Sequence, residues 1–195
     1  MIYLDFDGTL VDIWPRFYRV FCDINGCDSV EFEKYKKYKL EYVKDSIVAK
    51  KLGIDLTPKY FELKKKYLED EAYLVYDKPF LEADTVNQVF ESRAVILTKR
   101  RNKLNFEREL KRFNINLPYA VITGAISKKE WISQHNLGEN DIVIGDSIED
   151  LSAGELHNVK PVMLLSGLGS KTAFDATSIK YDLYYDINEV IKNGI

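Results

Sequence analysis

The chain has 195 residues, of which 46% are apolar and 13% aromatic, enough for one domain or for a domain with an insertion. Its formal net charge of −3 and its pI of about 5.6 give no general attraction to nucleic acid or to an anionic membrane surface. No segment has the apolar length that spans a bilayer, and no basic or long apolar leader precedes Asp5, so we expect a cytoplasmic protein.

The first predicted element is a strand at 1–4, followed at once by Asp5-Phe6-Asp7-Gly8-Thr9-Leu10. Alternate strand residues point the same way, so Asp5 and Asp7 can emerge together while Phe6 turns toward the core. Two close carboxylates repel each other unless a cation lies between them, and magnesium is the natural ion for hard oxygen ligands. The competing interpretation is a surface turn, since Asp-Gly is common in turns.

The next part of the chain has the pattern of helices. Apolar residues at spacings of three and four predict a helix over 11–24, closed by Asn25-Gly26. From about Val30 to Tyr76 lysine is dense and strand-like runs are missing, so two or three helices fit. One is predicted over 30–52, and another after Thr57-Pro58, with Thr57 as its N-cap.

The predicted helix over 30–52 has two apolar faces. The aliphatic face, expected to lie in a small helical core, consists of Leu40, Val43 and Ile47. The aromatic face consists of Tyr35, Tyr38 and Tyr42. We interpret the tyrosines as packing residues, because aromatic stripes at helical spacing are usually packing; contact with a ligand is the alternative.

Beyond Pro79 the pattern alternates between helix and strand. Strands are predicted at 94–97, 120–123, 141–144, 161–165 and 181–185. Ser127-Lys128-Lys129-Glu130 has the form of a capping box that opens one of the intervening helices. Such alternation predicts an α/β fold with a doubly wound, mostly parallel sheet and helices on both faces.

Several strands end in polar residues. Leu4 is followed by Asp5, Leu97 by Thr98, and Ile144 by Gly145-Asp146. In open parallel sheets the ligand lies outside the carboxyl ends of the strands, so this coincidence predicts an active site at that edge. The candidate residues are Asp5, Asp7, Thr98, Lys128, Asp146 and Asp150.

This set of side chains suits phosphoryl transfer. Acids from two strands can enclose a magnesium ion that binds a phosphate oxygen. One carboxylate can attack phosphorus to form an aspartyl-phosphate, and a second can protonate the departing oxygen and later deprotonate water. A hydroxyl and a lysine can hold the phosphate oxygens, which is the positioning and charge neutralisation that the reaction needs.

Four segments resemble the motifs of the haloacid dehalogenase superfamily of phosphohydrolases. They are Asp5-Phe6-Asp7-Gly8-Thr9-Leu10-Val11-Asp12, Val95-Ile96-Leu97-Thr98, Lys128 within Ser127-Lys128-Lys129-Glu130, and Gly145-Asp146-Ser147-Ile148-Glu149-Asp150. Their order and spacing agree along almost the whole chain. The resemblance implies a catalytic core over 1–13 and 79–195, and a small α-helical cap over 14–78.

The resemblance also implies a role for each matched residue. Asp5 would be the nucleophile and a magnesium ligand, and Asp7 the acid/base, which gives the metal its backbone carbonyl. Asp146 would bind magnesium, with Asp150 beside it, directly or through water.

Thr98, Lys99 and Lys128 are the predicted phosphate-binding residues. Lys128 is preferred over Lys129 because it directly follows the expected N-cap, Ser127, although a solvated helix-end lysine is the alternative interpretation. Arg100-Arg101 could reach an anionic substrate, but we interpret the pair as a solvated helix start.

We therefore predict a magnesium-dependent phosphatase that hydrolyses a small-molecule phosphate monoester through an aspartyl-phosphate on Asp5. The alternatives are a 5′-nucleotidase or phosphomutase of the same superfamily, and a non-catalytic phospho-accepting signalling domain. No nucleic acid polymer and no membrane is expected as a partner.

Overall fold

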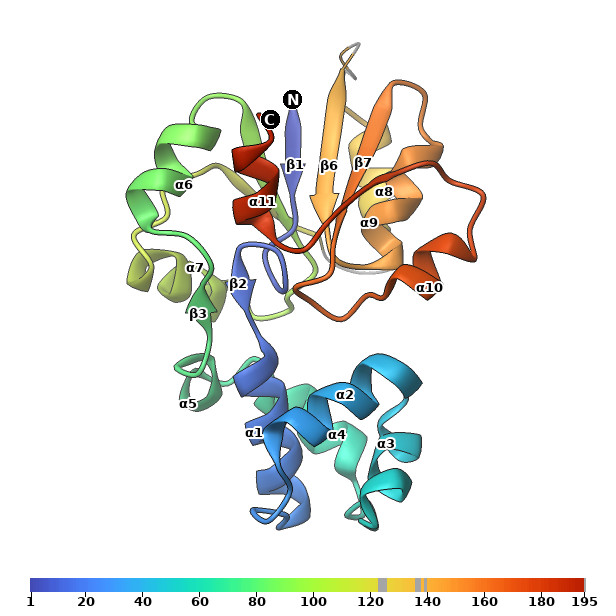
Figure 1. Ribbon diagram of the computed structural model, residues 1–195. Helices are drawn as coiled ribbons and strands as arrows, with labels where there is room; N and C mark the ends of the chain where they lie inside the picture. Colours follow the sequence, from blue (N-terminus) through green and yellow to red (C-terminus); the bar gives the residue numbers. More distant parts are fainter. Residues whose placement is uncertain (123–125, 136–137, 139, 195) are drawn as a thin grey trace. The chain divides into compact units, whose positions relative to one another are not determined.

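The computed structural model describes residues 1–122, 126–135, 138 and 140–194 (Figure 1). The chain divides into two compact units. The core unit consists of Met1–Asp12 and Pro79–Ile195, and the helical unit consists of Ile13–Lys78. Two short strands, β2 (Val11–Asp12) and β3 (Lys78–Pro79), pair with each other in a sheet of their own.

The core unit is built on a six-stranded sheet in the order β5-β4-β1-β6-β7-β8. All neighbouring strands in it are parallel. Its strands are β1 (Ile2–Leu4), β4 (Ala94–Thr98), β5 (Tyr119–Val121), β6 (Asp141–Gly145), β7 (Val159–Leu164) and β8 (Asp182–Tyr184). The predicted α/β fold with a parallel sheet is confirmed. Thr123, placed in a predicted strand, lies outside the described residues.

Both faces of this sheet carry apolar side chains and helices (Figure 1). The helices of the core unit are α6 (Ala83–Phe90), α7 (Lys103–Arg112), α8 (Lys128–Ser133), α9 (Ile148–Ser152), α10 (Lys171–Asp175) and α11 (Ile187–Lys192), with a short 3-10 turn at Ala153–Glu155. Leu4 packs with Phe106 of α7 in one cluster, whereas Tyr3 packs with Ile132 of α8 in another. The central strands are therefore buried on both sides, which explains their continuous apolar runs.

The helical unit contains α1 (Trp14–Asn25), α2 (Phe32–Tyr42), α3 (Asp45–Leu52), α4 (Tyr60–Tyr67) and α5 (Glu71–Leu74). Gly26 ends α1 and Gly53 ends α3, each with a positive φ that favours glycine. Both helix ends are where the sequence predicts them. Cys22 and Cys27 are buried free thiols.

The predicted helix over 30–52 is wrong in one respect, because the structure has two helices there. Val43 separates them with a φ of 58°. Val43 and Ile47 are exposed by 60% and 39%, so the prediction that they lie in a helical core is also wrong. Tyr35, in contrast, is fully buried with its ring centroid 5.0 Å from that of Phe21, which confirms packing for this tyrosine.

A buried network of charged side chains joins α2, α3 and α4. Asp45 forms an ion pair with Lys39 at 2.8 Å and a second one with Lys64. All three side chains are largely removed from solvent. The aliphatic pattern was misleading because the helix breaks at Val43, which rotates the residues after it to a different face.

Thr57 is not the N-cap of the following helix. Its hydroxyl donates to the carbonyl of Ile24 at 2.8 Å, and the side-chain oxygen of Asn25 accepts its N–H at 2.9 Å. Helix α4 begins only at Tyr60, so Thr57 instead ties this loop to the end of α1. Within the described part of the chain, no helix has the length and apolar character needed to cross a bilayer.

Candidate active site

The site begins in the tight turn after β1. The carbonyl of Phe6 accepts the N–H groups of Thr9, Leu10 and Val11 at 3.3, 3.0 and 3.2 Å. Phe6 is fully buried and meets the ring of Phe106 edge-on, as predicted for the residue between the two acids. This anchoring leaves the flanking acids at the carboxyl edge of the sheet.

Gly8 allows the turn to approach the neighbouring strand. Its φ is +80°, and a Cβ there would lie 2.7 Å from Oδ2 of Asp146 and 2.8 Å from Cα of Gly167. The hydroxyl of Ser166 donates to the carbonyl of Gly8 at 2.6 Å and fixes the loop after β7 against the turn. Only a residue without a side chain fits at position 8.

Lys128 joins two of the acids. Its Nζ donates to Oδ1 of Asp5 at 2.5 Å and to Oδ1 of Asp150 at 2.7 Å, and all three side chains are buried. Asp5 directly follows β1, Lys128 opens α8, and Asp150 lies on α9. Three elements distant in the sequence thus place a cation between two carboxylates.

Local capping fixes both partners of this arrangement. Ser127 and Glu130 form the predicted capping box, which sets where α8 begins. Ser147 forms a second capping box with Asp150, whose Oδ2 accepts the Ser147 hydroxyl at 2.5 Å while its Oδ1 faces Lys128. Asp150 is therefore both a cap and a site residue.

Asp146, the residue after β6, completes a cluster of three buried carboxylates. Its Oδ2 accepts the N–H of Leu168 at 2.5 Å. Asp5, Asp146 and Asp150 each offer an oxygen, and these oxygens lie within 4.8 Å of one another. A Cβ on Gly167 would lie 1.9 Å from Oδ2 of Asp146, so the loop after β7 can pass the acid only as glycine.

The cluster carries more negative charge than Lys128 can balance. Burial, and then the charge of Asp150, raises the pKa of Asp146 above its usual range. Burial raises the pKa of Asp5 well above its usual range, although Lys128 opposes this. Burial by itself lowers the pKa of Lys128, but the carboxylates of Asp150 and Asp5 outweigh it and raise that pKa. Lys128 is therefore firmly cationic, whereas Asp5 and Asp146 have too little positive charge around them to stabilise both of their ionised forms.

A divalent ion fits this donor set. The three acids offer hard oxygen atoms at a spacing suited to a shared cation. The raised pKa values of Asp5 and Asp146 mean that additional positive charge would stabilise the ionised forms of these two acids. Magnesium prefers such carboxylate oxygens. The residues that would hold it are Asp5, Asp146 and Asp150.

Asp7 is held by an arginine. Nε of Arg100 donates to Oδ2 of Asp7 at 2.7 Å, and a terminal nitrogen donates to Oδ1 at 2.6 Å. The Arg100 side chain is only 4% exposed, and it also forms an ion pair with Glu109 of α7. The interpretation of Arg100 as a solvated helix start is therefore wrong.

Comparisons with known proteins locate this architecture. No protein-family model and no curated protein sequence matches the chain. Among solved structures, it is similar to a haloacid dehalogenase-like hydrolase from Streptococcus pneumoniae, with 16% identity, a TM-score of 0.64 and coverage of 98% of this chain and 97% of that chain. The chain has the haloacid dehalogenase-like fold.

Two further structures share this haloacid dehalogenase-like fold. One is a hydrolase from Deinococcus radiodurans with bound phosphate and sodium, at 13% identity and a TM-score of 0.64, covering 97% of this chain and 92% of that chain. The other, provisionally named a beta-phosphoglucomutase, is from Thermotoga maritima, at 13% identity and a TM-score of 0.62, covering 100% and 99%. At these identities the similarity establishes the fold.

The remaining predicted site residues occupy different places in this haloacid dehalogenase-like fold. Thr98 ends β4 and is buried, and its hydroxyl oxygen accepts the N–H of Arg100 at 3.3 Å. Lys99 is exposed and pairs with Glu149 at 3.1 Å. Lys129 forms an ion pair with the exposed Glu155, so of the two rival lysines it is Lys128 that lies among the acids.

Sequence reasoning missed Glu149 and the role of Arg100. Oε1 of Glu149 accepts the N–H of Lys128 at 3.1 Å and also pairs with Lys99, so it links α8 to α9 beside the site. A signal for Arg100 was present in α7, where Glu109 stands between the core residues Phe106 and Leu110. An acid next to a buried helix face needs a cation.

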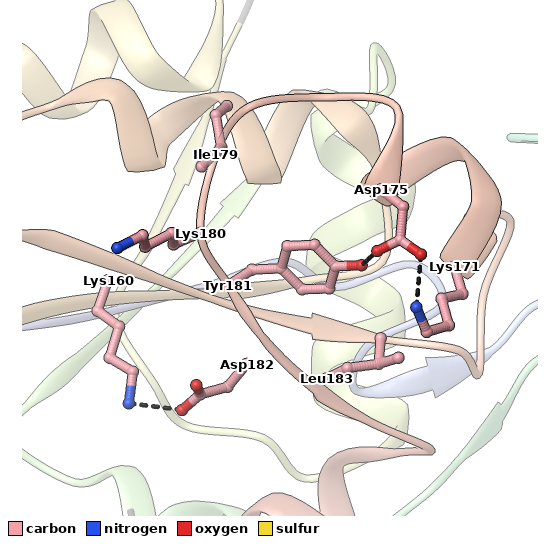
Figure 2. A pocket seen from close by; sticks show the side chains of 8 residues that line it. All are labelled: Lys160, Lys171, Asp175, Ile179, Lys180, Tyr181, Asp182 and Leu183. Carbon is pink, nitrogen blue, oxygen red and sulfur yellow. Dashed lines mark hydrogen bonds and ion pairs between the residues drawn. The ribbon is translucent and has the colours of Figure 1, made fainter.

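A hollow of about 640 Å³ lies apart from these residues, beside β8 and α10 (Figure 2). Figure 2 shows two ion pairs among its lining residues, Lys160 with Asp182 and Lys171 with Asp175. The nitrogen–oxygen distance is 2.5 Å in both pairs. The Tyr181 hydroxyl also donates to Asp175. None of the predicted site residues lines this hollow, so it is not part of the candidate active site.

Proposed function

We propose that the protein is a magnesium-dependent phosphatase that hydrolyses small-molecule phosphate monoesters through an aspartyl-phosphate on Asp5. The observation that carries the proposal is the ammonium group of Lys128 between Asp5 and Asp150, with Asp146 beside them. A nucleophile, a fixed cation and a set of metal ligands thus share the carboxyl edge of one sheet. Phosphoryl transfer needs these three things.

In the first step a carboxylate oxygen of Asp5 attacks phosphorus, and the bond from phosphorus to the ester oxygen breaks. Asp7, in its protonated form, donates a proton to the departing oxygen, so that the product leaves as an alcohol. Lys128 stabilises the charge on the phosphoryl oxygens. The buried hydroxyl of Thr98 is placed to donate to the same group.

In the second step Asp7 takes a proton from water, and the resulting hydroxide attacks phosphorus. The bond between phosphorus and Asp5 breaks, which releases inorganic phosphate and restores both carboxylates. When bound, magnesium would supply charge neutralisation to the phosphate oxygens, held by Asp5, Asp146, Asp150 and the backbone carbonyl of Asp7. The neighbour of the same fold with bound phosphate and sodium supports phosphate as a ligand of this fold.

The helical unit is proposed as a cap that selects the substrate. It is inserted in the chain directly after the turn that holds Asp7, and it returns to the core unit at Pro79. An insertion with two short connections can open and close around a ligand and exclude water from the reaction.

A phosphomutase is the second candidate, because a neighbour of the same fold is provisionally named a beta-phosphoglucomutase. In that case a second hydroxyl of the substrate, and not water, would accept the phosphoryl group from Asp5. Conversion of one sugar phosphate isomer to another without release of phosphate would identify this activity.

A panel of phosphate monoesters tests the proposal. Nucleotides, sugar phosphates, phosphorylated small acids and an aryl phosphate are incubated with the full chain, with magnesium or with a chelator. We expect release of inorganic phosphate that depends on magnesium and is lost in Asp5→Asn. Equal turnover by Asp5→Asn, or no effect of the chelator, would contradict the proposal. Transfer of a phosphoryl group to the protein without continued release of inorganic phosphate would instead indicate a phospho-accepting signalling domain.

A further inference from the structure

Arg100 is buried beside Asp7, although it is not among the residues proposed to bind phosphate or metal. It follows β4 by two residues, and its side chain is 4% exposed. Nε and one terminal nitrogen contact the two carboxylate oxygens of Asp7, and the other terminal nitrogen contacts Glu109. The guanidinium therefore uses all three of its nitrogens on these two acids.

Aromatic rings restrict the same guanidinium from its sides. Its central carbon lies 5.0 Å from the ring centroid of Phe6 and 5.7 Å from that of Phe106. Glu109 is in turn paired with Arg112 at 3.0 Å. The ion pair with Glu109 and the contacts with the two rings thus fix the Arg100 side chain independently of Asp7.

We propose that Arg100 is a positioning residue that holds the carboxyl group of Asp7 in one orientation for proton transfer. This inference rests on the proposed function, in which Asp7 is the acid/base. A bidentate fork fixes both the rotamer and the plane of a carboxylate, whereas a point charge such as lysine fixes neither. Because Arg100 is buried and contacts both carboxylate oxygens of Asp7, we assign its effect on the reaction to the orientation of Asp7.

A purely structural ion pair predicts different behaviour. Such a pair would join α7 to the turn after β1, and its loss would lower the stability of the fold. Any accompanying loss of kcat would then be the same for every ester, whatever its leaving group. A positioning role instead concerns the step in which the ester oxygen takes a proton. That step matters more for an alkyl phosphate, whose leaving group is strongly basic, than for an aryl phosphate.

The test compares Arg100→Lys, Arg101→Lys and Asp7→Asn, and combines Arg100→Lys with Asp7→Asn. For each protein, kcat and KM are measured with magnesium on an alkyl and an aryl phosphate, alongside the Tm. In Arg100→Lys we expect kcat on the alkyl ester to fall by about 100-fold, the cost of a small misplacement of a catalytic group. The fall on the aryl ester is smaller, KM changes little, and Arg101→Lys keeps wild-type kinetics.

The double variant decides whether Arg100 acts through Asp7. We expect it to be no slower than Asp7→Asn alone, because the residue that Arg100 positions is already disabled. Independent, multiplying losses would overturn the inference, as would equal losses on both esters or a change confined to KM. In each of these cases the wild-type activity, and with it the proposed function, still stands.

Absence of turnover by the wild-type chain would instead overturn the proposed function, and this inference with it. If Arg100→Lys does not fold, Glu109→Gln replaces it, because that change keeps the fork on Asp7 and loosens only its anchor. A smaller loss of kcat with the same dependence on the leaving group supports the inference. A loss that is equal on both esters contradicts it.

Discussion

Nζ of Lys128 lies 2.5 Å from Oδ1 of Asp5, between the end of β1 and the start of α8. In the free protein this contact neutralises the proposed nucleophile. A bound phosphate would bring its own negative oxygens to the same ammonium group, so the lysine can stabilise the substrate and release the carboxylate for attack. This single contact links the electrostatics of the acid cluster to its proposed chemistry.

Lys128→Met should lower kcat/KM by about 100- to 1,000-fold, the usual cost of removing one charge-stabilising donor. Lys129→Met is the matched control, because Lys129 pairs with Glu155 outside the site, and we expect it to stay within about threefold of wild type. Steady-state kinetics on the best ester of the panel gives the comparison. Similar losses in both variants would show that the contact with Asp5 has no special role.

Asp146→Asn should separate metal binding from folding. In the absence of metal, the variant should be more stable than wild type by about 1 kcal/mol at neutral pH, because it removes a buried charge that its surroundings disfavour. The amide oxygen can still accept the N–H of Leu168. Denaturant unfolding without metal measures this difference, and a less stable variant would contradict the electrostatic account of the cluster.

Magnesium should raise the Tm of the wild type and leave that of Asp146→Asn nearly unchanged. A ligand that binds only the folded state stabilises it by about 2.7 kcal/mol at 100 times its dissociation constant. Asp175→Asn, which alters a surface ion pair with Lys171, serves as the control and should keep the full response. An equal Tm increase in wild type and Asp146→Asn would place the ion elsewhere.

The stability of the helical unit should depend strongly on Asp45. Asp45→Asn leaves Lys39 and Lys64 without a full counter-charge in a buried position, and we expect a loss of about 3 kcal/mol. The control is Asp28→Asn, because Asp28 is an 82% exposed partner of Arg19, and this change should cost less than about 0.5 kcal/mol.

The fluorescence of Trp14 provides the measurement. In a Trp131→Phe background, the buried Trp14 is the remaining tryptophan, and its fluorescence reports the unfolding of the helical unit alone.

The effect of Asp45 depends on pH with a definite sign. Burial alone would raise the pKa of Asp45, but the ammonium groups of Lys64 and Lys39 outweigh it and hold that pKa below its usual range. Burial also lowers the pKa of Lys64, so the pairing only partly offsets the desolvation of that lysine. A lowered carboxyl pKa stabilises the fold above the unfolded value of about 3.9. The gap between wild type and Asp45→Asn should therefore persist down to about pH 4 and shrink below it.

The sequence was most informative where a local rule and the sheet topology agree. Strand β1 and its paired acids, the capping box at Ser127 and the sheet edge at Asp146 follow from alternation, capping and the carboxyl-end rule. These rules placed Lys128 at the start of a helix near that edge. Its position between Asp5 and Asp150 required the three-dimensional structure.

The wrong predictions concern features that periodicity and composition do not encode. A positive φ at Val43, unusual for a β-branched residue, breaks a helix that periodicity extends to Leu52. Thr57 has the composition of an N-cap, but it bonds to the end of α1 instead. Arg100 follows a strand in the manner of a solvated residue, but it is buried, because the fold brings Asp7 from the turn after β1 and Glu109 from α7 into contact with it.

The most direct test of the central claim is to trap the phosphorylated enzyme. The wild-type chain is mixed with its best substrate and magnesium, quenched in acid within the first turnover, digested and analysed by mass spectrometry. We predict a phosphoryl group on Asp5, sensitive to hydroxylamine as an acyl phosphate is, and absent from Asp5→Asn. Full turnover with an unmodified Asp5 at every quench time, or a phosphoryl group on another residue, would contradict the assignment of Asp5 as the nucleophile.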